Sequence, residues 1–166
     1  IYGLARAVDA QKIGTGKLVK SFLGGNSHSN FEITDTDNTV PTITIDQSTI
    51  AWTSCGMKYP LPKPDDLLSS DNYHHCCSQD QGCYGDAFAV NRGGSFKLIV
   101  TNSLFKNIVS DGIDVIYAGI TNVKVHNTRF ENIAGANIKW SGPLDAEGNY
   151  FIGGYGIMWE GKPWVT

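Results

Sequence analysis

The sequence predicts an all-β chain folded as a right-handed parallel β-helix, a solenoid with coils of about 25 residues. Two observations predict this fold: the second half of the chain repeats every 25 residues, and each repeat holds short runs of alternating apolar and polar residues. Composition is the third observation, because 19 of the 166 residues are glycine and only 17% are charged. This composition is typical of turn-rich β proteins and not of helical bundles.

The repeat is visible as identical residues at one offset. Asn107 recurs as Asn132, and Phe105 recurs as Phe130. Because equivalent positions of adjacent coils stack about 4.8 Å apart, we expect an asparagine ladder at the turns and a stacked phenylalanine pair inside. The matching segments are GDAFAV (85–90), SDGIDV (110–115) and GANIKW (135–140), FKLIV (96–100) and TNVKV (121–125), and NSLFKNI (102–108) and NTRFENI (127–133).

The strands themselves are predicted from alternation within each repeat. Side chains of a strand point in turn to its two faces. Ile113 and Val115 are therefore expected to face the core. Asp114 is expected to point outward, beside the equivalent Lys139 of the next coil.

A long loop insertion is predicted before the best repeats. TITIDQSTI (42–50) aligns with KLIVTNSLF (97–105) at an offset of 55, which is one coil plus about 30 further residues. Residues 54–83 account for this excess and contain three prolines and every cysteine. We expect a loop held by disulfides, whose pairing stays open. The cysteines are Cys55, Cys76, Cys77 and Cys83.

The remaining segments complete a single domain over residues 1–166. NFEIT (30–34) is expected to be a strand, and NYFI (149–152) and YGIMW (155–159) a shorter last coil. KLVKSFL (17–23) suits a strand or a short capping helix. Neither end shows a strong cap, so we expect either part of a longer solenoid or a homo-oligomer formed through the coil ends.

Charge and cysteine content limit the possible partners and the compartment. The net charge of -3 gives no reason to expect nucleic acid or an anionic membrane as a partner. No apolar run reaches the roughly 20 residues that a membrane-spanning helix needs. The chain opens without Met or a signal peptide, so a mature or excised product is expected. Four clustered cysteines favour disulfides and a secreted, extracellular protein.

Several acids recur in register with one lysine. Asp86 and Asp111 each follow a turn at equivalent positions of adjacent coils, and Asp114 lies beside Lys139. Such a patch has the charges that an acidic sugar would need. The structural alternative is that Asp114 and Lys139 form a solvated ion pair worth under about 1 kcal/mol, while Asp86 and Asp111 are ordinary turn residues.

Over residues 30–160, the stacked repeats with Asn-rich turns resemble the right-handed β-helix proteins of the pectate-lyase superfamily. SDGIDV is similar to the Asp-Gly-Ile-Asp strand of polygalacturonase-type glycosidases. GDAFAV is similar to their Gly-Asp-Asp strand, although the order is reversed and Ala87 replaces the second acid. The small pectate lyases have a His-Cys segment, then acids that bind calcium, then a basic residue, and this order is similar to that of His75-Cys76, Asp86, Asp111, Asp114 and Lys139.

The resemblance implies a lyase that cleaves a uronate-containing polysaccharide by β-elimination, with a glycoside hydrolase as a less favoured activity. A cation neutralises the sugar carboxylate, and a base removes the C5 proton. The implied residues are Lys139 and Asp114 for catalysis, Asp86, Asp111 and Asp114 for Ca²⁺, and Arg92, Arg129 and Trp140 for substrate binding.

Three alternatives stay open. His74, His75, Cys76 and Cys83 offer zinc ligands, although adjacent cysteines suit a tetrahedral site poorly. A non-catalytic β-helix that binds glycans or assembles with its own copies is the alternative function. Aromatic residues near the end form a sugar-stacking platform, a core plug or an oligomer contact; they are Tyr150, Phe151, Tyr155, Trp159 and Trp164.

Overall fold

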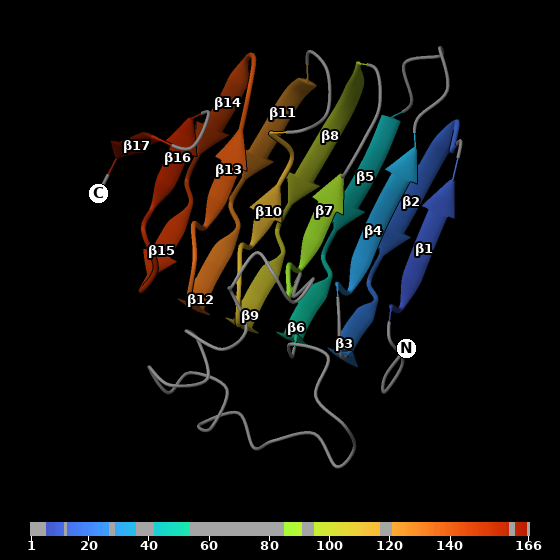
Figure 1. Cartoon of the computed structure of the whole chain (residues 1–166), viewed down its shortest axis with the longest axis horizontal. Helices are drawn as coiled ribbons and strands as arrows, with labels where there is room; N and C mark the ends of the chain where they lie inside the picture. Colours follow the sequence, from blue (N-terminus) through green and yellow to red (C-terminus); the bar gives the residue numbers. More distant parts are fainter. Residues whose placement is uncertain are drawn as a thin grey trace, which may run out of the picture.

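The computed structural model describes residues 6–11, 13–26, 29–35, 42–53, 85–90, 95–116, 121–159 and 162–165. These residues form strands and turns without a helix, and the strands wind into a parallel β-solenoid (Figure 1). Each coil adds one strand to each of three sheets, as the sequence repeat predicts. Among the described residues, no helix is long and apolar enough to cross a membrane.

The three sheets are named here by their strands. Sheet I contains β1 (Val8–Gln11), β4 (Phe31–Asp35), β7 (Phe88–Val90), β10 (Ile113–Asp114), β13 (Ile138–Trp140), β16 (Ile157–Trp159) and β17 (Lys162–Val165). Sheet II contains β2 (Thr15–Val19), β5 (Thr42–Asp46), β8 (Phe96–Thr101), β11 (Thr121–His126) and β14 (Leu144–Glu147). Sheet III contains β3 (Phe22–Asn26), β6 (Thr49–Thr53), β9 (Leu104–Ile108), β12 (Arg129–Ile133) and β15 (Tyr150–Ile152).

Strand pairing confirms both offsets read from the sequence. Ile113 pairs with Phe88 and with Ile138, which lie one coil before and one coil after it. Ile43 pairs with Leu98, across the offset of 55, so the extra residues fall between β6 and β7 in the chain. The predicted insertion at 54–83 lies outside the described residues, and its disulfides and zinc ligands stay predictions. KLVKSFL (17–23) forms parts of β2 and β3 and no helix.

Inward side chains of the three sheets fill the solenoid with a continuous apolar core. Phe105 and Phe130 stack at 4.9 Å between ring centroids, as predicted, and Phe130 stacks on Phe151 at 5.3 Å. Burying one such side chain stabilises the fold by about 1.5–3 kcal/mol, so these columns are a large part of what holds adjacent coils together.

Two files of left-handed residues shape the turns around sheet III. One file lies between sheets II and III and contains Lys20, Gln47, Asn102, Asn127 and Gly148; the other contains Gly25, Trp52, Asn107, Asn132 and Gly153. Asparagine and glycine adopt this conformation most readily, which explains the Asn-rich turns. The Asn132 amide donates to Asn107 Oδ1 at 3.1 Å, which confirms the predicted asparagine ladder.

A second ladder, formed by hydroxyl groups, was not foreseen. The backbone N–H of Ser21 donates to Ser48 Oγ at 3.1 Å, that of Ser48 to Ser103 Oγ at 3.2 Å, and that of Ser103 to Thr128 Oγ1 at 3.4 Å. Each hydroxyl therefore satisfies a backbone donor of the preceding coil. The sequence signal was a Ser or Thr directly after each of the first four left-handed residues between sheets II and III.

Candidate active site

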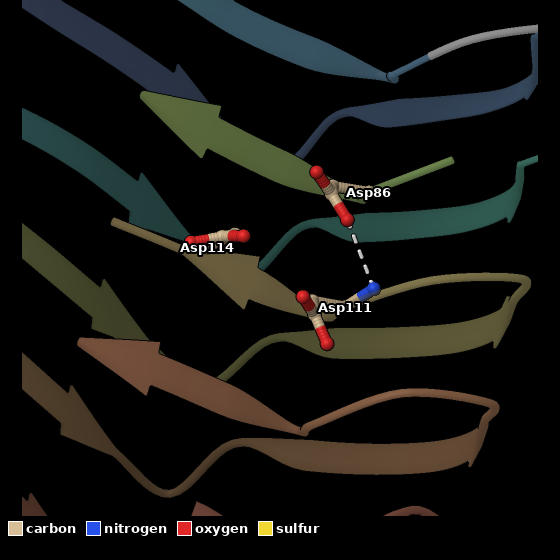
Figure 2. Close-up of side chains that lie close together, drawn as sticks. All are labelled: Asp86, Asp111 and Asp114. Carbon is tan, nitrogen blue, oxygen red and sulfur yellow. Dashed lines mark hydrogen bonds between the residues drawn. The ribbon is translucent and has the colours of Figure 1, made fainter. Parts of the chain in front are cut away.

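Three aspartates from adjacent coils meet at sheet I (Figure 2). One residue separates Asp86 from the start of β7, and one residue likewise separates Asp111 from the start of β10. Asp114 is the last residue of β10. Asp86 and Asp111 stack one above the other, with Asp114 to one side. Each residue offers a carboxylate oxygen, and these atoms lie within 4.8 Å of one another.

Two glycines make room for this arrangement. A Cβ atom on Gly135 would lie 2.3 Å from Asp111 Oδ1, so any other residue there would displace the carboxylate. A Cβ atom on Gly112 would lie 2.5 Å from the backbone oxygen of Asn137 in the next coil. Contacts this short do not occur for real side chains, so glycine at 135 leaves room for the Asp111 carboxylate and glycine at 112 lets the next coil approach between the two acids of SDGIDV.

Backbone N–H groups hold the three carboxylates in place. Asp86 Oδ1 accepts the N–H of Asp111 at 2.9 Å, and Asp111 Oδ1 accepts the N–H of Ala136 at 2.6 Å. Asp114 Oδ1 accepts the N–H of Ile116 at 3.3 Å. The first two bonds link successive coils, so the orientation of each acid is fixed by the solenoid itself.

Lys139 joins the cluster from the next coil. Its Nζ donates to Asp111 Oδ2 at 3.1 Å and to Asp114 Oδ2 at 2.9 Å. The predicted neighbours Asp114 and Lys139 are thus in contact, and Asp111 shares the same ammonium. The exposed fraction is 13% for the Asp111 side chain, 10% for Asp114 and 21% for Lys139, so this edge of the cluster reaches solvent while Asp86 is buried.

Burial and repulsion by neighbouring charges shift Asp86 and Asp114 toward their neutral forms. Burial, followed by repulsion from Asp111, raises the pKa of Asp114 to about 6. The pKa of Asp86 is raised well above its ordinary value by burial and then by the charges of Asp111 and Asp114. With a pKa of about 6, Asp114 is mostly ionised near pH 7, whereas its surroundings favour the neutral form of Asp86.

The same acids keep Lys139 charged. Burial alone would lower the pKa of Lys139, but attraction to Asp111 and Asp114 outweighs it and raises this pKa above the ordinary value. A lysine with a raised pKa is a poor proton acceptor at neutral pH. Of the two residues expected to be catalytic, Asp114 thus has the properties of a base and Lys139 those of a fixed positive charge.

Of the other expected site residues, Trp140 and Arg129 are not part of this cluster. Trp140 belongs to the core, with an exposed fraction of 3%, and its indole N–H donates to the Gly142 carbonyl at 3.0 Å. Its ring is therefore no exposed surface for sugar stacking, because the alternation that turns Lys139 outward turns Trp140 inward. Arg129 lies on sheet III and pairs with Glu131. Arg92 lies outside the described residues.

The outward side of sheet I also differs from expectation. A solvated ion pair was the structural alternative expected there, yet Asp114 is buried, and so are Ala89 and Glu32, which precede it in the same outward file. Glu32 accepts a hydrogen bond from Arg6, which also pairs with Asp9 at 3.2 Å. This second group of acidic and basic residues was not foreseen; its signal in the sequence was Glu32 at the alternate position of NFEIT.

The expected calcium ion does not fit the cluster as it stands. Calcium takes six to eight oxygen ligands, roughly 2.3–2.6 Å from the ion. Here the facing oxygens of Asp111 and Asp114 bind the Lys139 ammonium, and one oxygen of each acid accepts a backbone N–H. Burial and the charges of Asp111 and Asp114 also raise the pKa of Asp86, which makes it a weaker cation ligand than an ordinary aspartate.

The arrangement combines a partly exposed ammonium with an ionised acid of raised pKa. Such a pair can hold a carboxylate ligand at the ammonium and accept a proton at Asp114. No protein family, curated protein or solved structure matches this chain.

Proposed function

We propose that the protein is an extracellular lyase that cleaves a uronate-containing polysaccharide by β-elimination at Asp111, Asp114 and Lys139. The observation that carries this proposal is the Lys139 ammonium, which is shared by two carboxylates at 3.1 and 2.9 Å at the exposed edge of the cluster. Parallel stacking of coils, which the pectate-lyase superfamily shares, supports the proposal at the level of architecture only.

In the proposed reaction, Lys139 binds the C6 carboxylate of a uronate residue. Neutralising this carboxylate makes the neighbouring C5–H more acidic, because the negative charge that develops on removal of the proton is stabilised. Asp114 removes that proton, and its pKa of about 6 makes it a stronger base than an ordinary aspartate. The electron pair forms the C4=C5 double bond, the C4–O bond breaks, and the leaving oxygen takes a proton from water.

The test is to follow the ultraviolet absorbance of unsaturated products with polygalacturonate and with alginate. We expect product with one of these polymers, and kcat/KM should rise as the pH passes about 6, where Asp114 becomes ionised. Asp114→Asn should reduce kcat by about 10²–10⁴, the usual contribution of a general base. Lys106→Met is the control, because Lys106 is an exposed lysine on sheet III.

New reducing ends without ultraviolet absorbance would show hydrolysis and would contradict elimination. Full activity of Asp114→Asn would remove Asp114 from the mechanism. An absence of product with both polymers would reject the lyase for these substrates.

A second candidate function is end-to-end assembly of copies, which one observation favours. Among the described residues, the large exposed apolar side chains all lie at the two ends of the solenoid; they are Val19, Phe22, Tyr150, Phe151, Ile152 and Tyr155. The end formed by β14 carries exposed Asp145 and Glu147, and the end formed by β2 carries exposed Lys17. Opposite charges at the two ends, together with strand edges that have no further described strand to pair with, favour head-to-tail contact between copies.

Assembly is tested by sedimentation velocity over a range of protein concentrations. We expect association that weakens in high salt and in Phe151→Asp, because Phe151 ends the internal aromatic column and is 37% exposed. A monomer at every concentration would reject this function without affecting the lyase proposal.

A further inference from the structure

A side chain of the protein already binds two of the three aspartates that a metal ion would use. Lys139 Nζ lies within hydrogen-bond distance of Asp111 Oδ2 and Asp114 Oδ2, at 3.1 and 2.9 Å. The other oxygens of these two acids accept the N–H groups of Ala136 and Ile116. The pairing follows from the strand register, because Asp114 pairs directly with Lys139.

Replacing this ammonium by a metal ion would leave Lys139 without a partner of opposite charge. Within the described residues, the strand register pairs Lys139 with Asp114 on one side and Met158 on the other. Met158 offers no carboxylate for the ammonium, and an unpaired charge in a half-buried position is costly. A divalent cation must therefore compete with a lysine held by the fold.

The Lys139 ammonium has one N–H donor left with which it can bind a ligand. A lysine has three N–H donors, and the contacts with Asp111 and Asp114 use two of them. The third donor belongs to a side chain that is 21% exposed, more than either acid. A carboxylate of the substrate can thus bind Lys139 while both ion pairs persist.

We infer that Lys139 is the resident cation of this site, in the place of a calcium ion, and that the protein binds and cleaves its acidic polysaccharide without a metal. The catalytic half of this inference rests on the proposed function. The site selects a carboxylate-bearing sugar through a lysine, whereas a calcium-dependent site selects it through the metal.

Calorimetric titration of the substrate-free protein with calcium chloride at pH 7.5 tests the resident cation directly. We expect no saturable heat with the wild type, and no change in its melting temperature between calcium and EDTA. Lys139→Met frees Asp111 Oδ2 and Asp114 Oδ2 beside Asp86 and should gain calcium binding. It should gain about 5 °C or more in melting temperature when calcium is at roughly 100 times its Kd.

Two variants serve as controls in the same titration. Lys139→Arg keeps the cation and should bind no calcium, which keeps the test valid if Lys139→Met fails to fold. Lys106→Met removes a lysine from a pair with Glu131, 3.2 Å away on sheet III, and should also gain no calcium binding. Saturable calcium binding by the wild type, or calcium-dependent melting of Lys106→Met, would overturn the inference.

Activity on the polymer that is cleaved gives the second readout. We expect the same kcat/KM in EDTA and in calcium, and loss with EDTA that calcium restores would overturn metal-free cleavage. Because the calcium titration contains no substrate, an inactive protein that binds no calcium would reject the proposed function while supporting Lys139 as the resident cation.

Discussion

Two lysine–carboxylate pairs of the same solenoid differ in what surrounds them. On sheet I, Lys139 lies 2.9 Å from Asp114 of the preceding coil. On sheet III, Lys106 lies 3.2 Å from Glu131 of the following coil. Both pairs are outward and in direct register, yet the exposed fraction is 21% for the Lys139 side chain and 40% for Lys106.

The two carboxylates respond in opposite directions. The pKa of Asp114 is raised to about 6, because burial and the charge of Asp111 outweigh the attraction and hydrogen bond of Lys139, which lower it. Burial also acts to raise the pKa of Glu131, but hydrogen bonds and attraction from Lys106 and Arg129 lower it overall. One cation serves several acids on sheet I, whereas two cations serve one acid on sheet III. The balance of charges, and not the pair itself, sets the chemistry of the position.

The largest expected effect is the loss of stability on breaking the buried pair. Lys139→Met leaves Asp111 and Asp114 without their shared cation, and we expect the free energy of unfolding at pH 7.5 to fall by roughly 3–5 kcal/mol. Urea denaturation measures it. The matched Lys106→Met should cost less than about 1 kcal/mol, because its pair is exposed to solvent. Equal losses in the two variants would contradict the difference between the two sheets.

The second largest expected effect is a difference in how the two pairs, Asp114–Lys139 and Glu131–Lys106, make the free energy of unfolding depend on pH. The folded-state pKa of Asp114 is above the unfolded value, so its proton stabilises the fold at low pH, and this stabilisation is lost as the pH rises from about 4 to 6. The raised pKa of Asp86 acts in the same direction. A shift of about two pKa units corresponds to roughly 3 kcal/mol. Asp114→Asn should flatten the fall in unfolding free energy over this range.

Glu131 supplies the control of opposite sign for that experiment. Its folded-state pKa is lowered, so its contribution is present above its unfolded pKa and is lost as the pH falls through the folded value. Urea denaturation at several pH values should show the effect of Glu131→Gln growing with pH. Identical pH profiles of Asp114→Asn and the wild type would show that Asp114 titrates normally.

The coils and the contact between Asp114 and Lys139 were predictable because they depend on register, which the identities at an offset of 25 residues reveal. The burial of Asp114 was not predictable from alternation. Alternation assigns a side chain to the outward face, but burial depends on what else in the fold lies against that face. The inward position of Trp140 followed from the same alternation, and its assignment to substrate binding overlooked it.

A neutral polar position on the same solenoid gives a smaller expected effect. Ser103 Oγ accepts the backbone N–H of Ser48 at 3.2 Å and donates to the Thr101 carbonyl at 2.7 Å. Ser103→Ala leaves the buried donor of Ser48 without its acceptor, so we expect a loss of about 1–3 kcal/mol. Thermal unfolding at pH 7 should show it, with no change between low and high salt because no ion pair is removed. A salt-dependent loss would indicate that charges had rearranged.

The smallest effect should be the coupling between Lys106 and Glu131, which a double-mutant cycle with Lys106→Met and Glu131→Gln isolates. Both side chains are held at 3.2 Å, but solvent screens the pair and Arg129 competes for the same carboxylate. We expect a coupling energy of about 0.2–1 kcal/mol at low ionic strength, falling toward zero in 1 M salt. The equivalent cycle with Lys139→Met and Asp114→Asn should give a larger coupling that persists in salt, because burial protects that pair from screening. If salt removed both couplings equally, sheet I would behave as a solvated surface, and the lysine would have no advantage over a metal ion there.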